Sequence, residues 1–120
     1  MRLKKNEIKL KQLKGRTKIL DLFENGKVYR SKKILIRLKK EEKLPFLAVA
    51  VAVSKKNFTR AVDRNYIKRQ MRVALKKIEG DICFSGACFV LYTGIDLPKS
   101  NTLPSLMKEL FKKVGDSLSF

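Results

Sequence analysis

The segment that most constrains the fold is the apolar run Phe46–Val53, which reads Phe-Leu-Ala-Val-Ala-Val-Ala-Val. It is far shorter than the roughly 18 apolar residues of a membrane-spanning helix. Its valines and alanines alternate with the period of two that is typical of a β-strand. Because the run is apolar on both faces, we expect a central strand of a covered sheet. The valines would line one face, and the small alanines would let another element, such as a helix, pack closely on the other.

Helices are predicted on both sides of this strand, because apolar residues recur there at helical spacing. The predicted ranges are 17–25, 60–78 and 103–114. In the first helix, Thr17 is expected to act as the N-cap, and Gly26 is expected to end the helix in the left-handed conformation. The apolar stripe of the second helix consists of Ile67, Met71, Ala74, Leu75 and Ile78.

Two further strands are predicted, over residues 28–39 and 87–92, where apolar residues alternate with polar ones or run continuously. The resulting order of helix, strands, long basic helix, strand and helix is that of an α+β or split βαβ domain. We therefore expect one domain over residues 17–120. Residues 1–16 are rich in Lys and Arg and hold a single acid, which indicates a mobile basic arm or a solvated tail without a fixed partner.

The net charge of the chain indicates which class of molecule it binds. The chain carries 29 Lys and Arg against 11 Asp and Glu, a formal charge of +18 at pH 7. Such a charge destabilises the compact state by self-repulsion, which a polyanion relieves, so nucleic acid is the expected partner. The alternative is an anionic membrane surface, which favours basic helices with Trp or Phe on the apolar face. Because the chain has no Trp, no membrane partner is expected.

The side chains that usually drive hydrolysis are missing. The chain has no His, which excludes Ser–His and Cys–His nucleophilic catalysis. Its acids are scattered, whereas a two-metal site needs carboxylates that converge, so a protein-only metal nuclease is disfavoured. Cys83 and Cys88 lack partner ligands at zinc spacing and lie in an apolar stretch. We expect both to be reduced, in or near the core of a cytoplasmic protein.

The positive charge is concentrated directly after the central strand. Between Ser54 and Lys77 lie nine Lys and Arg and a single acid, Asp63. They begin in a Ser-Lys-Lys loop and continue along the long helix, beside its apolar stripe. Exposed helices usually mix Glu with Lys for mutual support, but this helix has no Glu before Glu79. Arg binds phosphate through paired hydrogen bonds and Lys acts as a point charge, so this face is predicted to bind RNA rather than only solvent.

The same residues carry a family resemblance. The segment Val49–Lys56, followed by Ala61–Arg69, resembles the protein subunit (protein component) of bacterial ribonuclease P. That family has a strand, a Ser/Ala-Lys-Lys segment, a short loop and the "RNR" motif, in which Tyr66 here replaces the last Arg. Residues 22–26 and 105–113 resemble the family's first and last helices, so the resemblance covers most of the chain.

The resemblance implies a fold and a function. The implied fold is a single-domain α–β sandwich, with about four strands packed against three helices and a left-handed βαβ crossover, like ribosomal protein S5 domain 2. Ribonuclease P is an endoribonuclease of tRNA processing that removes the 5′ leader from precursor tRNA. Its RNA subunit performs the hydrolysis with Mg²⁺ bound mainly by the RNA, so no catalytic residue, organic cofactor or obligate protein partner is expected here. The alternative is a non-catalytic, ribosomal-type RNA-binding protein of similar fold.

Residue roles follow from the resemblance together with the charge pattern. Contacts with the catalytic RNA are expected from Arg64, Asn65, Tyr66, Lys68, Arg69, Arg72 and Lys76. Loop contacts where this RNA meets the leader cleft are expected from Ser54, Lys55, Lys56 and Arg60. The single-stranded leader of precursor tRNA is expected to face Phe23, Lys33 and Arg37. For Phe23, a place in the core is the alternative.

Overall fold

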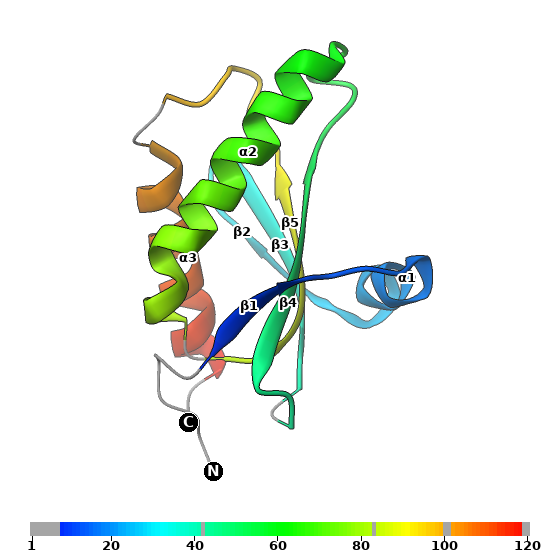
Figure 1. Cartoon of the computed structure of the whole chain (residues 1–120), viewed down its shortest axis with the longest axis vertical. Coiled ribbons are helices and arrows are strands. Elements are labelled where there is room, and N and C mark those ends of the chain that lie inside the picture. Colours follow the sequence, from blue (N-terminus) through cyan, green and yellow to red (C-terminus); the bar gives the residue numbers. More distant parts are fainter. Residues whose placement is uncertain (1–7, 42, 83, 100–101, 119–120) are drawn as a thin grey trace.

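Five strands and three α-helices form the part of the chain that the computed structural model describes, residues 8–41, 43–82, 84–99 and 102–118 (Figure 1). The strands are β1 (Lys9–Gln12), β2 (Lys27–Arg30), β3 (Ile34–Lys40), β4 (Phe46–Val53) and β5 (Gly86–Tyr92). The helices are α1 (Arg16–Asn25), α2 (Ala61–Ile78) and α3 (Thr102–Leu118), and a 3₁₀ turn, Glu79–Asp81, follows α2.

The strands form one mixed sheet in the order β1-β4-β5-β3-β2. β4 runs parallel to both of its neighbours, β1 and β5, whereas β3 is antiparallel to β5 and to β2. The prediction of a central strand at Phe46–Val53 is therefore confirmed. Its connection through α2 to the parallel strand β5 is the βαβ unit of the expected α–β sandwich. The sheet has five strands rather than the four or so that the resemblance implied. The sequence pattern missed two of them, because the residues of β1 were assigned to an arm and β2 and β3 were taken as one strand.

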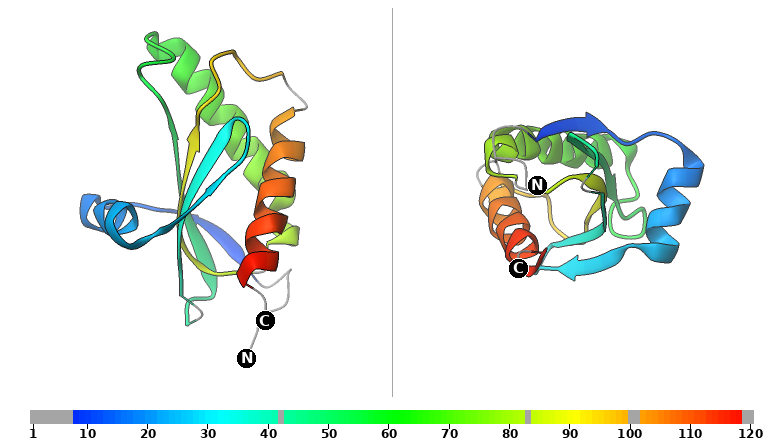
Figure 2. Two further views of the ribbon diagram at one scale, coloured as in Figure 1. Left: turned by 180° about the vertical axis from the view of Figure 1, so that it is seen from behind. Right: turned by 90° about the horizontal axis from the view of Figure 1, so that it is seen from below.

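Helices cover the two faces of the sheet unequally (Figures 1 and 2). α2 and α3 lie on one face, where Val49 and Val53 of β4 belong to the larger hydrophobic core. α1 lies on the other face, where Ala48 forms a smaller cluster with Leu13 and Leu22. The valine and alanine faces of β4 therefore separate as predicted, and the small alanine side chains let α1 approach the sheet closely.

α2 buries the stripe that the sequence predicted. Ile67, Met71, Ala74, Leu75 and Ile78 are all buried. Each large side chain in this stripe stabilises the fold by about 1.5–3 kcal/mol through the apolar surface that it removes from water. Because this side of the helix faces the core, the basic residues between these positions are directed towards solvent. The helix begins at Ala61, one residue later than predicted.

The prediction of one strand over residues 28–39 is wrong, because the chain turns back within that range. β2 and β3 form an antiparallel hairpin, and in its turn the Ser31 amide donates to the Ile34 carbonyl oxygen over 2.8 Å. Turns are usually marked by Gly, Pro, Asn, Asp or Ser. The turn here is Ser31-Lys32-Lys33, in which Ser31 is the only such residue, so the residue pattern did not reveal it.

Both ends of α1 differ from the prediction. The N-cap residue is Gly15 with φ 104°, a left-handed value that glycine adopts without steric cost, and no side chain caps the helix. Thr17 therefore lies inside the first turn instead of capping it. Gly26 has an extended backbone with φ −79° instead of the expected left-handed one. Glycine is required at this position for a steric reason instead, because a Cβ atom there would lie 2.5 Å from the Leu22 carbonyl oxygen.

The mobile arm expected over residues 1–16 is not observed from Ile8 onward, and residues 1–7 lie outside the described part. Ile8 and Leu13 are buried, with 2% and 6% of their surface exposed, and they flank β1. β1 pairs with β4 from Lys9↔Phe46 to Gln12↔Val49. The apolar residues of this segment are isolated among basic ones and form no local strand pattern. The strand was not predicted, because it forms only by pairing with β4, which lies far away in the sequence.

The described cysteine agrees with the prediction. Cys88 is free and buried, and its burial raises the pKa of the thiol well above its ordinary value. Cys83 lies outside the described residues. No helix in the described ranges is long and apolar enough to span a membrane.

Candidate nucleic-acid interface

The outward side of α2 presents the predicted basic residues together, and we call it the basic helix face. Its exposed members are Asn65, Tyr66, Arg69, Arg72 and Lys76, and Lys68 is half-buried beside them. Lys76 forms an ion pair with Glu79, with 3.1 Å between Nζ and Oε1, but its side chain stays 80% exposed. Long cationic side chains on a regular helix can follow the phosphate backbone of a nucleic acid.

The loop between β4 and α2, residues 54–59, is fixed by contacts with the end of β5 and by a hydrogen bond within the loop. The Asn57 side-chain amide donates to the carbonyl oxygens of Thr93 and Gly94, over 3.3 and 3.4 Å. The Phe58 amide donates to the Ser54 carbonyl oxygen, and the Phe58 ring is buried beside Tyr92 with 6.1 Å between the centroids. The loop is therefore ordered by the protein itself. Its lysines, Lys55 and Lys56, are exposed, as is Arg60 at the N-cap of α2.

Arg64 has a contact that the sequence did not predict. Its Nη1 donates to the carbonyl oxygens of Phe58 and Thr59, over 2.9 and 2.8 Å. The guanidinium thus ties the first turn of α2 to the end of the preceding loop. A guanidinium carries five N–H donors, so an RNA contact by the others stays a prediction.

A second surface lies on the face of the sheet that α1 covers only in part, and we call it the α1-side face. Strand register places its side chains in rows that cross the sheet. One row is Ala50, Phe89, Arg37 and Val28, and the next is Ala52, Leu91, Leu35 and Arg30. The three central strands contribute half-buried side chains to both rows, and Val28 and Arg30 of the edge strand are exposed. Partial exposure of apolar and aromatic groups beside cations suits an unstacked nucleic-acid strand.

Phe23 and Arg37, which were predicted to face the leader, meet on this face. The Phe23 ring is 43% exposed and lies 5.1 Å from the Phe89 ring, centroid to centroid. The Arg37 guanidinium carbon lies 4.8 Å from the Phe23 ring centroid, and its Nη1 donates to the Phe23 carbonyl oxygen over 3.4 Å. Phe23 is therefore a surface aromatic and not a core residue.

Phe89 and Arg30 are an aromatic and a cationic member of this face that sequence reasoning missed. Phe89 belongs to a continuous apolar strand, so the sequence alone did not say which face it occupies. Arg30 precedes the unrecognised turn and was placed inside one long strand. In the structure, the alternation of buried and half-buried residues along β5 places Phe89 on the less buried face.

Lys33 lies apart from the Phe23–Arg37 pair, at the end of the sheet. Its carbonyl oxygen accepts a hydrogen bond of 2.7 Å from the Thr93 amide. Thr93 also accepts from Asn57, so the β2–β3 turn and the 54–59 loop are joined through one residue. The exposed Lys33 therefore lies at the end of the sheet that the 54–59 loop borders.

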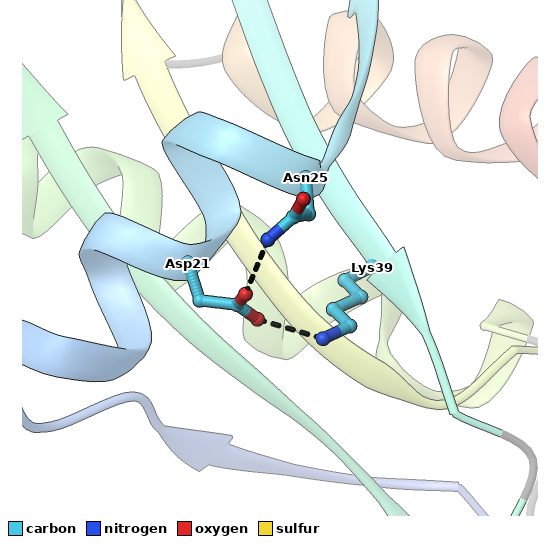
Figure 3. A network of polar contacts seen from close by, with 3 residues as sticks. All are labelled: Asp21, Asn25 and Lys39. Carbon is cyan, nitrogen blue, oxygen red and sulfur yellow. Dashed lines mark hydrogen bonds and ion pairs between the residues drawn. The ribbon is translucent and has the colours of Figure 1, made fainter.

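A small polar network holds α1 on the sheet (Figure 3). The Lys39 ammonium donates to Asp21 over 2.8 Å, and the Asn25 side-chain amide donates to the same carboxylate over 2.7 Å. The Lys39 hydrogen bond, followed by that of Asn25, lowers the pKa of Asp21 below its ordinary value. The Asp21 carboxylate in turn raises the pKa of Lys39. Because α1 carries Phe23, this network and the buried Leu22 together place the ring on the α1-side face.

Within the described ranges, no group of three or more His, Cys, Asp or Glu side chains is placed to hold a metal ion.

Comparison with known proteins identifies similar chains. Residues 8–115 match the family model described as Ribonuclease P. The ribonuclease P protein of Staphylococcus aureus has a similar structure, with a TM-score of 0.74 at 17% identity, covering 86% of this chain and 94% of that one. The ribonuclease P protein from Thermotoga maritima gives 0.67 at 17% identity, covering 92% and 99%. No curated protein sequence matches significantly.

Proposed function

Because the chain belongs to the ribonuclease P protein family, and is therefore a subunit of the tRNA-processing ribonucleoprotein, we propose a specific division of labour. The protein binds the catalytic RNA with the basic helix face and the 54–59 loop. It binds the single-stranded 5′ leader of precursor tRNA with the α1-side face. The RNA subunit performs the hydrolysis.

The observation that carries this proposal is the arrangement of the two surfaces around one end of the sheet. Asn57 and Thr93 join the 54–59 loop to the end of β5, and Thr93 also contacts the β2–β3 turn. A strand lying on the α1-side face would therefore leave it beside the loop lysines and α2. This geometry allows one protein to hold the catalytic RNA and the leader at the same time.

The basic helix face supports RNA binding through electrostatics. Its cations would displace counterions from phosphates, which gives affinity that falls steeply with salt. They would also screen the repulsion between the catalytic RNA and the precursor. Exposed Tyr66, which replaces the family's Arg, offers a ring for a base or ribose in place of a charge.

The α1-side face supports leader binding through stacking. Phe23 and Phe89 form a tilted aromatic pair, and Arg37 lies over the Phe23 ring. Aromatic rings stack on bases of any sequence, and Arg adds charge toward the phosphates. We therefore expect the face to bind leaders with little sequence preference.

The protein's contribution to catalysis is positional. Holding the leader orients the scissile phosphate on the RNA subunit, which lowers the entropic part of the barrier. Mg²⁺ would supply Lewis-acid chemistry from sites mainly on the RNA, since it prefers oxygen ligands. The side chains that define the two protein surfaces are mostly cationic and aromatic.

Reconstitution tests this function. The protein is mixed with a bacterial ribonuclease P RNA and a precursor tRNA at low Mg²⁺ and moderate salt, where the RNA alone is slow. We expect cleavage at the mature 5′ end that requires both components. Tight, salt-sensitive RNA binding without stimulated cleavage would contradict the proposal and favour a ribosomal-type RNA-binding protein.

A further inference from the structure

A groove lies between β1, the edge of β4 and α2, on the opposite side of the sheet from α1. It has a volume of about 430 Å³, which falls within the range of small-molecule sites. Apolar side chains from all three elements contribute to its lining, among them Leu10, Val51 and Leu75. Gln12, Arg72, Lys76 and Glu79 also line it. The two cations belong to the basic helix face, so the groove opens beside that face.

The groove exposes part of an unpaired strand edge. β1 pairs with β4 only as far as Gln12↔Val49, and the Leu13 amide then donates to the Val49 carbonyl oxygen over 2.9 Å. Backbone groups point alternately to the two sides of a strand, so the N–H and C=O of Val51 point the same way as those of Val49. Among the described strands none continues the ladder there, because after β1 the chain turns away from the edge of β4 and enters α1 (Figure 1).

The charge of the groove favours an anionic occupant. Both cations of the groove, Arg72 and Lys76, come from α2, because the ammonium of Lys11 on β1 lies over the Phe46 ring, 4.5 Å from its centroid. The one acid, Glu79, is already used within the protein. Its Oε2 accepts from the Leu10 amide over 2.9 Å and its Oε1 accepts from Lys76. These hydrogen bonds lower the pKa of Glu79, so the acid serves to hold β1 against α2.

We propose that this groove receives one unstacked nucleotide of the catalytic RNA, which deepens the proposed function and rests on it. The base would contact the apolar floor and hydrogen-bond the free backbone groups at Val51. Arg72 and Lys76 would bind its phosphate. Because a backbone edge offers one donor and one acceptor to any base, little base preference is expected.

A peptide strand is the less suitable occupant. Strand addition draws its affinity from a run of main-chain hydrogen bonds along an edge. Here only residues 50–53 of β4 lie beyond the pairing with β1, and the chain leading to α1 departs from the same edge. A run this short offers few ladder hydrogen bonds, whereas a single base needs only one or two.

A substitution that fills the groove with a large side chain tests the proposal. Gln12 is exposed and lines the groove, so Gln12→Trp would occupy the space without removing a cation, and Gln12→Ala is the matched control that leaves it open. Affinity for a bacterial ribonuclease P RNA is measured for both and for the unmodified protein at one salt concentration. We expect about a tenfold loss for Gln12→Trp, the scale of one lost base contact, and a change below about twofold for Gln12→Ala.

A second measurement tests the groove without the RNA subunit. Adenosine 5′-monophosphate is titrated into ¹⁵N-labelled protein, and the amide resonances are followed by NMR. We expect shifts at Val51 and Leu13 that Gln12→Trp abolishes. Unchanged RNA affinity in Gln12→Trp, or shifts confined to the exposed side of α2, would overturn the proposal.

The two proposals fail in different ways. If the unmodified protein does not stimulate cleavage, the proposed function fails, whereas the groove is judged by comparing the two Gln12 variants and by the nucleotide shifts. A concentration-dependent dimer in sedimentation that Gln12→Trp abolishes would overturn the nucleotide proposal, because it would assign the edge to a second copy of the chain.

Discussion

The guanidinium carbon of Arg37 lies 4.8 Å from the centroid of the Phe23 ring. This contact joins β3 to the last turn of α1, and the Phe23 ring also meets Phe89 of β5. A cation over an aromatic face that is partly exposed to water contributes about 0.5–1 kcal/mol. The larger consequence is geometric, because the contact fixes a charge and a stacking surface side by side on the α1-side face.

Arg37→Ala is predicted to separate leader binding from binding of the tRNA body. Removing the guanidinium deletes a cation from the α1-side face and loosens the Phe23 ring. We expect weaker affinity for precursor tRNA and unchanged affinity for mature tRNA, both measured with the assembled holoenzyme. Lys112→Ala, at an exposed position of α3 on the other side of the sheet, is the control. Equal losses for precursor and mature tRNA would contradict leader binding at this face.

Phe23→Ala is predicted to weaken leader binding with little cost in stability. One stacked base contributes about 1–3 kcal/mol, so we expect roughly a tenfold loss in affinity for precursor tRNA. Phe23 is 43% exposed and Leu20 on the same helix is 52% exposed, so Leu20→Ala is a matched control. If Leu20→Ala also weakens affinity for precursor tRNA in a way that depends on the leader, the effect comes from α1 as a whole and not from the Phe23 ring.

Arg64→Ala and Arg69→Ala are predicted to weaken binding of the catalytic RNA for different reasons. Arg64 donates hydrogen bonds to the carbonyl oxygens of Phe58 and Thr59, so its removal should speed amide hydrogen exchange in the 54–59 loop. Arg69 is exposed on the basic helix face, and its removal should leave that exchange unchanged. We expect each to cost about 1–3 kcal/mol in RNA affinity, the scale of a charge-assisted contact.

If the exchange rates of the 54–59 loop stay the same in Arg64→Ala, the assigned loop contact is wrong. If RNA affinity stays the same in Arg69→Ala with the fold intact, this residue is outside the interface.

The Asp21–Lys39 pair predicts a pH dependence of stability. The pKa of Asp21 is lowered in the folded protein, so its stabilisation is present above the ordinary carboxyl pKa of 3.8 and is lost as pH falls through the lower folded value. The pKa of Lys39 is raised, so its part is lost only as pH rises through a value above 10.5. We expect Asp21→Asn to reduce the free energy of unfolding at neutral pH and to differ less from the unmodified protein in acid.

Denaturant titrations across acidic and neutral pH measure this difference. Asp116→Asn at an exposed position of α3 is the control. A difference between Asp21→Asn and the unmodified protein that does not shrink in acid would contradict the role of the ion pair.

Glu79→Ala is predicted to release β1 from α2. The Glu79 carboxylate accepts from the Leu10 amide, and losing such a hydrogen bond costs about 1 kcal/mol. We expect faster amide exchange at Leu10, whereas Glu79→Gln, which keeps an acceptor, should retain part of the protection. Exchange that is the same in Glu79→Ala and in the unmodified protein would exclude this hydrogen bond as the anchor of β1.

Local patterns were enough for the elements that carry most of the core. The apolar residues on both faces of β4 predicted an interior strand, and the stripe from Ile67 to Ile78 oriented α2. Once one side of a helix faces the core, its other side must face solvent. For this reason the outward direction of Arg69 and Arg72 was predictable from the sequence as well.

Other features were decided only by tertiary structure. β1 becomes a strand because β4 offers it a parallel edge, and Phe89 joins Phe23 and Arg37 because strand register aligns them. Arg64 contacts Phe58 and Thr59 because the preceding loop folds back over the first turn of α2. The period of a helix or strand depends on neighbouring residues and can be seen in the sequence. Strand pairing, register and the direction of a long side chain depend on residues that only folding brings together.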